Sequence, residues 1–300
     1  MDYFIYSKAP HHLKDIDVID EFDPIWEFGH EKCLRIKPSS LKMHYNKGIE
    51  ICFITKGRYN WKVEDKEYEL LPGNGFLTCP WEYHGSEKGV LDLGEIWWIV
   101  ISPELFEKDG RFKLGKWSAL NKTENKEIGA VLSKNAFSVI HRAQELKILF
   151  YKLYSELKRK DFGYRTKVYS LIDSILILMV RIIKNQKKNQ EKNKSWLKHL
   201  NYELLDDISK KWTVEEMASI FNMGTTSFNG KVKKLTGYTP SSYLIHLRIK
   251  NAKKLLADKT SNLTKIALDC GFYSSQHFSG TFLKWTGTTP SAFRKKAPAK

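Results

Sequence analysis

The chain has 300 residues, long enough for two domains, and a formal net charge of +16 from 50 Lys and Arg against 34 Asp and Glu. Apolar residues make up 42% of it and aromatic residues 13%, so the chain can bury sizeable cores and extended disorder is excluded. The charge is uneven: residues 184–300 hold 22 basic and 8 acidic residues, whereas residues 1–183 hold 28 and 26. The C-terminal part should therefore be attracted to a polyanion.

We expect neither a signal peptide nor a membrane span. The N-terminus lacks a basic segment followed by an apolar one. The longest apolar stretch, Leu171–Ile183, contains Asp173 and is shorter than the ~20 residues that a span needs. The four cysteines form no Cys-x-x-Cys pair, which suits a reducing compartment. These patterns predict a cytoplasmic protein with reduced thiols and no membrane contact.

Short strands separated by turns are expected from about Ile49 to Ile101. Apolar runs such as Ile51–Ile54 alternate with turn signals, of which Pro72–Gly75 is the strongest. Many short strands interrupted by Gly and Pro are typical of a small β-barrel or jelly roll. We assign this domain to residues 1–138.

Helical periodicity replaces this pattern after about residue 138. Leucines recur at helical spacing from Leu146 to Leu157, and a second apolar helix follows the break at Asp161–Gly163. That helix is apolar around so much of its circumference that the barrel or another subunit must cover it. We expect residues 139–183 to form a helical hairpin that dimerises, and residues 184–194, which hold no apolar side chain, to form a solvated linker.

The C-terminal part contains an internal duplication. Lys234–Tyr243 is repeated at an offset of 50 as Lys284–Phe293, with one extra residue in the second turn. Each copy has the pattern of a helix, a tight turn and a second helix. Thr213 with Glu three residues later forms a capping box, Asn262 is the corresponding cap in the second copy, and glycines end the second helices. The pattern predicts helix-turn-helix units at about 213–237 and 262–287, within a domain at 195–300.

A helix should connect the two copies. Thr239 is an N-cap followed by Pro240 at the first helical position, and the helix is expected to reach about residue 259. Roughly 20 residues at ~1.5 Å each span ~30 Å, close to the ~34 Å between successive major grooves on one face of DNA. A single helix could thus hold two recognition helices one DNA turn apart.

These residues resemble the AraC/XylS transcription regulators. The similarity lies in Leu244–Leu256, in Ile266-Ala267 followed by Gly271-Phe272, and in Thr286–Pro290. It covers about a third of the chain and is highly specific. It implies two helix-turn-helix modules joined by a linker helix, double-stranded DNA as a partner and RNA polymerase as a further partner.

The resemblance also implies which side chains contact DNA. Asn229 and Gln276 are the preferred base-contacting residues, because Asn and Gln can pair bidentately with adenine. Lysines on the same helices would contact phosphates and contribute affinity rather than sequence choice. The complete expected set is Thr225, Thr226, Asn229, Lys231, Lys233, Lys234, Ser275, Gln276, Ser279 and Lys284.

Two glycines depart from the family pattern. Family members often place Arg in each recognition helix, whereas this sequence has Gly230 and Gly280. A glycine inside a helix costs about 1 kcal/mol relative to alanine. Either the missing side chain lets the backbone approach the groove closely, or specificity at those base pairs is relaxed.

The N-terminal domain is similar to the cupin sensor domains of the same family. His44-x-Asn46-x3-Glu50-x6-Gly57 and Pro80-x3-His84 resemble the two cupin motifs. Metal-dependent cupins present a further His where this chain has Asn46. Two imidazoles and one carboxylate would remain, which is the ligand set of a non-haem iron site.

A small-molecule pocket is the reading that we prefer over a metal. Six of the nine Trp residues precede Ser118, and aromatic faces stack on sugar rings while His and Glu bond to hydroxyl groups. The same Trp residues could equally be core. We select His44, Glu50, Trp61 and His84 as ligand-binding residues, with a carbohydrate as the candidate effector and no metal or other cofactor.

The sequence therefore predicts a two-domain α+β protein: an N-terminal cupin-like β-barrel with a helical hairpin, and a C-terminal all-α double helix-turn-helix domain. We expect a non-enzymatic, homodimeric transcription regulator that responds to a small molecule. Two alternatives stay open. One is a metal-dependent cupin oxygenase fused to a DNA-binding module, and the other is a constitutive DNA-binding protein with an inert barrel.

Overall fold

The computed structural model describes residues 3–7, 16–18, 20–36, 40–134, 139–141, 143–258 and 261–296. The chain divides into two compact units, Met1–Lys188 and Asn189–Lys300. The expected boundaries at residues 138, 259 and 300 lie outside the described residues. Within the described ranges, no helix is both long and apolar enough to cross a membrane.

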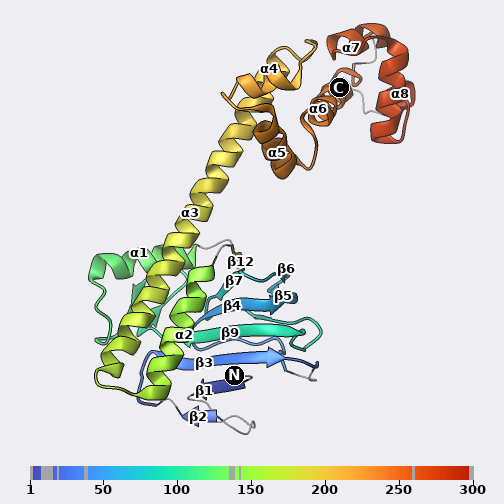
Figure 1. Ribbon diagram of the computed structural model, residues 1–300. Coiled ribbons are helices and arrows are strands. Elements are labelled where there is room, and N and C mark those ends of the chain that lie inside the picture. The colour runs from blue at the N-terminus through green and yellow to red at the C-terminus, as the bar shows by residue number, and fades with distance from the viewer. Residues whose placement is uncertain are drawn as a thin grey trace. The chain divides into compact units, whose positions relative to one another are not determined.

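A seven-stranded sheet forms the centre of the first unit (Figure 1). Its strand order is β12-β7-β4-β9-β3-β1-β2, and every neighbouring pair is antiparallel except β1 and β2. The strands are β1 (Tyr3–Ser7), β2 (Ile16–Val18), β3 (Ile25–Cys33), β4 (Ile49–Gly57), β7 (Gly75–Thr78), β9 (Gly94–Ile101) and β12 (Val139–Ile140).

Two small sheets accompany the large one. One contains β5 (Tyr59–Val63), β6 (Lys66–Leu70) and β8 (His84–Gly85), and the other pairs β10 (Leu105–Phe106) with β11 (Phe112–Lys113). The N-terminal unit is rich in β-structure as expected, but the barrel does not close, because among the described residues β12 and β2 are the outer strands of the large sheet. Strands β5, β6 and β8 pair with one another instead of completing a ring.

Both faces of the large sheet are buried, as the long apolar strands β4 and β9 require. Along β4, Ile49, Ile51 and Phe53 belong to a core on one face, whereas Cys52 and Ile54 belong to a second core with Trp61 and Leu70 of the three-stranded sheet. Alternate side chains of a strand point to opposite faces, so one strand serves both cores. Glu50 shares its face with Cys52 and Ile54, on the side of the small sheet.

Three helices cover the other face of the large sheet (Figure 1). They are α1 (Lys122–Ser133), α2 (Gln144–Arg159) and the first part of α3 (Tyr164–Asp206). The apolar residues of α3 from Val168 to Met179 that join this core are fully buried within the chain itself. We expected either the barrel or another subunit to cover the second hairpin helix. In the structure, the large sheet of the same chain covers it.

Residues 184–194, the expected linker, are helical and lie inside α3. This segment contains Lys, Glu, Gln and Asn but neither Gly nor Pro. Lys, Glu and Gln are good helix formers, so the lack of apolar side chains does not prevent a helix. The division between the two compact units nevertheless falls within this segment.

The second unit consists of the end of α3 and six shorter helices. They are α4 (Val214–Ser219), α5 (Thr225–Thr236), α6 (Pro240–Leu255), α7 (Leu263–Asp269), α8 (Ser275–Thr286) and α9 (Pro290–Lys296). The local signals are confirmed: Thr213 and Glu216 form the capping box, and the side chains of Thr239 and Asn262 accept hydrogen bonds from backbone amides. Gly237 and Gly287 end α5 and α8 with φ of 78° and 74°.

Each helix-turn-helix unit has its own core, and α6 contributes to both. The first core contains Phe228 and Val232 of α5, and the second contains Phe278 and Phe282 of α8. The N-terminal half of α6 supplies Leu244 and Leu247 to the first core, and its C-terminal half supplies Ile249 and Ala252 to the second. At 16 residues, α6 is shorter than expected and spans about 24 Å.

Two glycines of α5 should respond in opposite ways to replacement by alanine. Gly237→Ala should destabilise the C-terminal compact unit, residues 189–300, by about 1 kcal/mol, because alanine is strained at a left-handed φ of 78°. Gly230→Ala should stabilise it by about 1 kcal/mol, because the helix position is exposed and an added Cβ meets nothing within 4 Å. Hydrogen exchange of α5 peptides in the intact chain measures both, and equal effects of the same sign would contradict this assignment.

Candidate functional site

The second helix of each unit starts after a turn with one residue in the left-handed region. These residues are Asn222 (φ 51°) and Gly271 (φ 78°), which occupy matching places in the two copies. Each turn is closed in the same way: the amide of Met223 donates to the carbonyl of Ala218 at 3.1 Å, and that of Phe272 to Ala267 at 2.9 Å. The duplication seen in the sequence is thus a duplication of backbone geometry.

One face of each recognition helix is buried and the opposite face is exposed. In α5 the exposed residues include Thr226, Gly230, Lys233 and Lys234, whereas Thr225, Asn229 and Lys231 are half-buried. In α8 the exposed residues include Gln276, Gly280 and Lys284, whereas Ser275 and Ser279 are half-buried. The exposed faces hold mainly polar side chains and glycine, with Leu283 of α8 as an apolar exception, which suits hydrogen bonding to base edges and phosphates.

The two preferred base-contacting residues differ in their surroundings. The side-chain amide of Asn229 donates from Nδ2 to the carbonyl of Thr225 at 2.9 Å. Asn229 is thus bonded to its own helix, and its side chain would have to rotate to reach a base. Gln276 is exposed, and its Oε1 lies 3.3 Å from the hydroxyl of Ser275. Gln276 therefore presents its amide to solvent more freely than Asn229 does.

The lysines also fall into two groups. The ammonium of Lys231 lies 4.4 Å from the ring centroid of Trp196, a cation–π contact that holds it against the first core. Lys233, Lys234 and Lys284 are exposed and extend the polar faces of their helices. These three are therefore better placed than Lys231 to meet a phosphate.

His277 is a further residue of α8 that the sequence patterns did not indicate. This side chain is exposed next to Gln276, and its ring lies 5.5 Å from the rings of both Phe272 and Tyr273. It occupies the position that Ser227 has in the first copy. Helical periodicity from Gln276 to Lys284 would have placed His277 at the edge of the same face.

Comparison with known proteins identifies the C-terminal helices. Residues 217–296 match the model of a helix-turn-helix domain family. The chain is 26% identical over 145 residues to the HTH-type transcriptional regulator MtrA of Neisseria gonorrhoeae, which covers 46% of this chain and 48% of that protein. It is 33% identical over 119 residues to the HTH-type transcriptional activator RhaS of Escherichia fergusonii, which covers 39% and 43%. The matched segments thus span less than half the length of these relatives.

Residues 217–296 form an AraC-type helix-turn-helix domain.

Solved structures similar to the AraC-type domain cover about a third of the chain. One is the DNA-binding domain of AdpA in complex with a target DNA, with 28% identity and a TM-score of 0.32 over 33% of this chain and 89% of that one. Another is an AraC-type regulator from Chromobacterium violaceum, with 24% identity and a TM-score of 0.34 over 36% and 96%.

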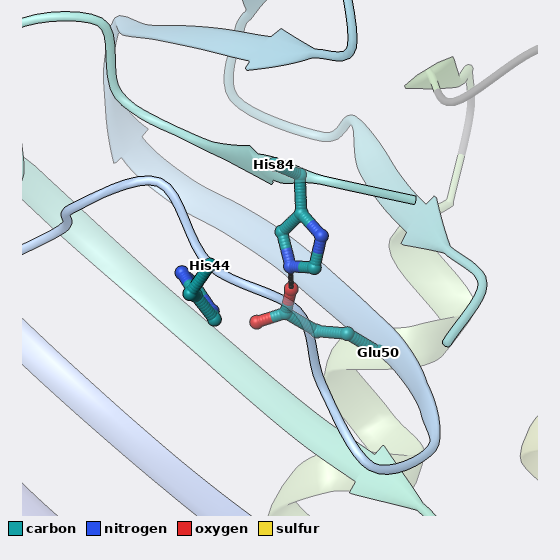
Figure 2. Close-up of side chains that lie close together, drawn as sticks. All are labelled: His44, Glu50 and His84. Atoms are coloured by element: carbon teal, nitrogen blue, oxygen red, sulfur yellow. Dashed lines mark ion pairs between the residues drawn. The ribbon is translucent and has the colours of Figure 1, made fainter. Parts of the chain in front are cut away.

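Outside the AraC-type domain, the structure brings His44, Glu50 and His84 together (Figure 2). Glu50 comes from β4 and His84 from β8, and the backbones of His44 and His84 exchange two hydrogen bonds of 2.8 and 3.0 Å. One ligand atom from each of the three side chains lies within 4.8 Å of the others. Three of the four expected ligand-binding residues therefore form one cluster, which we call the polar trio.

A buried ion pair lies at the centre of the polar trio. Nε2 of His84 is 2.8 Å from Oε2 of Glu50, and Nδ1 of His84 is 2.7 Å from the carbonyl oxygen of Glu82. A carbonyl oxygen can only accept, so Nδ1 carries a proton and Nε2 points at the carboxylate. The hydroxyl of Thr78 lies 3.4 Å from the same carboxylate oxygen. Thr78 is directly opposite Glu50 in the β4–β7 register, a position that sequence reasoning did not identify.

The two charges stabilise each other against burial. Burial alone would raise the pKa of Glu50, but the hydrogen bond and charge of His84 outweigh it and hold the pKa below its usual value. Burial alone would lower the pKa of His84, but Glu50 outweighs it and raises the pKa. Glu50 is 6% exposed and His84 is fully buried, so solvent screens the pair weakly.

The donor set of the polar trio also suits a divalent metal ion. Two imidazoles and one carboxylate would hold it, provided that Nε2 of His84 releases its proton and turns from Glu50 to the metal. Nδ2 of Asn46 lies 3.2 Å from that same nitrogen. An amide NH₂ group only donates, so it cannot bind a cation, and it can donate to Nε2 only when that nitrogen has lost its proton.

Trp61 is placed apart from the polar trio. It is buried in the core, 5.1 Å from the ring of Phe76, and its Nε1 has no hydrogen-bond partner among the described residues. It lines a hollow of about 440 Å³ whose other residues are mostly charged or polar, including Asn60, Lys62 and Asp92. None of the contacts described for the trio involves Trp61, so the expected pocket of four residues is not seen as one cluster.

The Glu50–His84 pair should make stability depend on pH in a defined window. The lowered pKa of Glu50 gives stability above the ordinary glutamate value of 4.5, which is lost as the pH falls through the folded pKa. The raised pKa of His84 gives stability below the ordinary histidine value of 6.5, which is lost as the pH rises through the folded pKa.

We therefore expect Glu50→Gln to lower the free energy of unfolding most between these two pH values, by about 3 kcal/mol. The loss should shrink as the pH rises beyond the folded pKa of His84. Chemical unfolding with a chelator present, at half-unit pH steps, measures the difference from the wild type. A loss that does not vary with pH would show that the pair is not ionised as described.

Proposed function

We propose that this protein is a sequence-specific DNA-binding transcriptional regulator that responds to a small molecule. The observation that carries the proposal is the paired geometry of the AraC-type domain: two recognition helices, α5 and α8, each with one buried face and one exposed, mainly polar face. In this arrangement the second helix of each unit enters a major groove. The named relatives MtrA and RhaS are regulators of the HTH type, which supports the same class.

Affinity and specificity would come from different side chains. The basic excess of residues 184–300, which hold 22 basic and 8 acidic residues, favours a phosphate backbone irrespective of its sequence. Lys233, Lys234 and Lys284 supply charge on the recognition helices themselves. Gln276 would pair with adenine in the second unit, and Asn229 would do so in the first after it leaves the carbonyl of Thr225.

The N-terminal unit is the proposed sensor. In the polar trio, His44 is half-buried, whereas Glu50 and His84 are buried, so a ligand would approach from the side of His44. A polyhydroxylated ligand such as a carbohydrate would donate hydrogen bonds to Nε2 of His44 and to the carboxylate of Glu50. A ligand that binds two arrangements of the protein with different affinity would then change DNA binding.

A homodimer and a cytoplasmic location complete the proposal. The helical hairpin leaves Ile148, Tyr151 and Phe162 exposed, at 57%, 42% and 109% of their reference areas. Ile148 and Tyr151 are one helical turn apart on α2, so they share a face that a second copy could cover. RNA polymerase would be the further protein partner of an activator.

Two substitutions on α8 should separate specificity from affinity. Gln276→Ala should weaken binding to the best operator by about 1–3 kcal/mol and relax the base preference at one position, because it removes a bidentate donor and acceptor pair. Lys284→Gln should weaken binding to all sequences alike and reduce the slope of log K against log salt by about 1. Fluorescence anisotropy with selected and random duplexes, at several salt concentrations, measures both.

The matched control is Lys265→Gln, which removes the same charge from an exposed position of α7 outside the recognition helices. It should change the salt slope less than Lys284→Gln does. Equal discrimination between operator and random DNA by the wild type and Gln276→Ala would remove Gln276 from the base-contacting set. Wild-type protein that prefers no duplex sequence at all would overturn the proposed function.

A second candidate function is favoured by the ligand set of the polar trio, namely a metal-dependent cupin oxygenase fused to the DNA-binding module. The two candidates give different results with the purified protein. A sensor should be stabilised by a member of a panel of mono- and disaccharides, by a few degrees in Tm at saturation, and Glu50→Gln should abolish the shift.

An oxygenase should instead contain about one iron per chain by elemental analysis, and His84→Gln should lose it. Tyr45→Phe is a suitable control for both measurements, because Tyr45 is 61% exposed next to the trio and contributes no ligand atom to it. Stoichiometric iron with no saccharide response would contradict the sensor and support the oxygenase.

A further inference from the structure

An aromatic cluster joins the two helix-turn-helix units to the linker helix. Tyr238 follows α5, His246 lies on α6 and Trp285 lies at the end of α8. The ring centroid of Tyr238 is 5.4 Å from those of both His246 and Trp285, and the centroids of His246 and Trp285 are 6.1 Å apart. We call these three residues the aromatic junction. Each member contacts the other two, so the junction closes a triangle between three separate elements.

The internal duplication shows that the junction is not a by-product of repetition. The residues that end the recognition helices are the same in both copies: Thr and Gly at 236–237 and at 286–287. The junction residues are not shared, because Trp285 corresponds to Leu235 and Tyr238 corresponds to Thr288. Each copy therefore carries one large aromatic residue, Tyr238 or Trp285, where it contacts the other copy, and these two residues stand at different positions of the repeat.

Further contacts between the two helix-turn-helix units lie at Arg248 of α6 and next to it. Arg248 donates from Nε to the carbonyl of Ile208 at 3.1 Å and from Nη2 to that of Lys210 at 2.6 Å. A Cβ added to Gly271 would lie 2.6 Å from the same guanidinium, so the turn of the second unit packs directly against it. The ammonium of Lys211 lies 5.2 Å from the ring of Tyr273.

The aromatic junction and the Arg248 contacts together hold the two units at two places. The buried residues of the units form separate cores, and α6 is the helix that contributes to both. Contacts at a single place would leave the units free to turn about α6, whereas contacts at two places fix an angle. The junction is only partly buried: Tyr238 is 37% exposed, whereas Trp285 also packs against the second core.

From these observations we infer that the aromatic junction sets the spacing and the rotation between α5 and α8, and thereby selects the distance between the two half-elements of the DNA site. The inference rests on the proposed DNA-binding function. Each inserted base pair moves the second half-element by ~3.4 Å and turns it by roughly a tenth of the helix, so a fixed angle between the recognition helices rejects the wrong spacing.

The geometric part of the inference is tested without DNA. Gly230→Cys and Gly280→Cys place one spin label on each recognition helix, at exposed positions where an added Cβ meets nothing within 4 Å. The four native cysteines are buried and should label poorly. In the full-length chain we expect one narrow distance distribution, which Tyr238→Ala and Trp285→Leu should broaden or shift.

Tyr202→Ala is the matched control, because Tyr202 is 66% exposed on α3 in the same compact unit and lies outside the junction. It should leave the distribution unchanged. Tyr238→Phe keeps the ring and should also behave as the wild type. Leucine at position 285 is the residue of the first copy, so the second helix should still fold, and helical circular dichroism checks this.

The functional part is tested by selecting duplexes with zero to three base pairs inserted between the half-elements. The wild type should prefer one spacing, and the preference should fall about tenfold in Tyr238→Ala and Trp285→Leu, because each loses two aromatic contacts. Preference for the bases of each half-element should stay unchanged. Variants that keep both the wild-type distances and the wild-type spacing preference would overturn the inference.

The proposed function and the inference about spacing would be overturned by different results. A wild-type chain that binds no duplex specifically would overturn the proposed function and with it the role in spacing, whereas the label distances would still report whether the junction holds the helices. A wild-type chain that binds specifically but tolerates every spacing would overturn the inference alone.

Discussion

The arrangement of the C-terminal unit depends on one helix that is buried at both of its ends. Leu244 and Leu247 of α6 complete the first core, and Ile249 and Ala252 complete the second. Each helix-turn-helix unit has two short helices of its own, and the end of α3 adds Leu200 and Leu204 to the first core. Because both cores share α6, this helix joins the two helix-turn-helix units, while the aromatic junction and the Arg248 contacts would fix the angle at which α5 and α8 present their exposed faces.

The parts of the fold that could be predicted are those decided by local chemistry. The capping box at Thr213, the Pro240 helix start and the glycine stops at Gly237 and Gly287 each depend on a few neighbouring residues, so their positions follow from the sequence. Strand pairing depends on residues far apart in the chain, which is why the sequence indicated many strands but not the open seven-stranded sheet. The helical state of residues 184–194 did not follow from the sequence, because a lack of apolar residues excludes a core position, not a helix.

The difference between local patterns and long-range contacts also explains which residues of the candidate sensor site could be predicted. His44, Glu50 and His84 could be grouped because two short motifs place them at fixed intervals, and the structure brings them within 4.8 Å. Thr78 was not found because its place opposite Glu50 depends on the register between β4 and β7. Trp61 was grouped with them on chemical grounds alone, and the alternation of β5 directs it to the core beside Phe76. The aromatic junction is invisible in the sequence for a related reason, since its residues meet only once both units have packed on α6.

The duplication separates the residues that hold the domain in shape from those that would choose a DNA sequence. Thr, Gly and Thr-Pro recur at 236–240 and 286–290, and Gly230 and Gly280 recur within the helices, so the two copies share one backbone frame. The exposed side chains differ: Thr226 corresponds to Gln276, and Lys233 corresponds to Leu283. Two identical helices would favour a repeated half-element, whereas these two present different side chains. Under the proposed DNA-binding function, a single chain would therefore recognise an asymmetric site whose two parts are unrelated in sequence, at a distance that the aromatic junction sets.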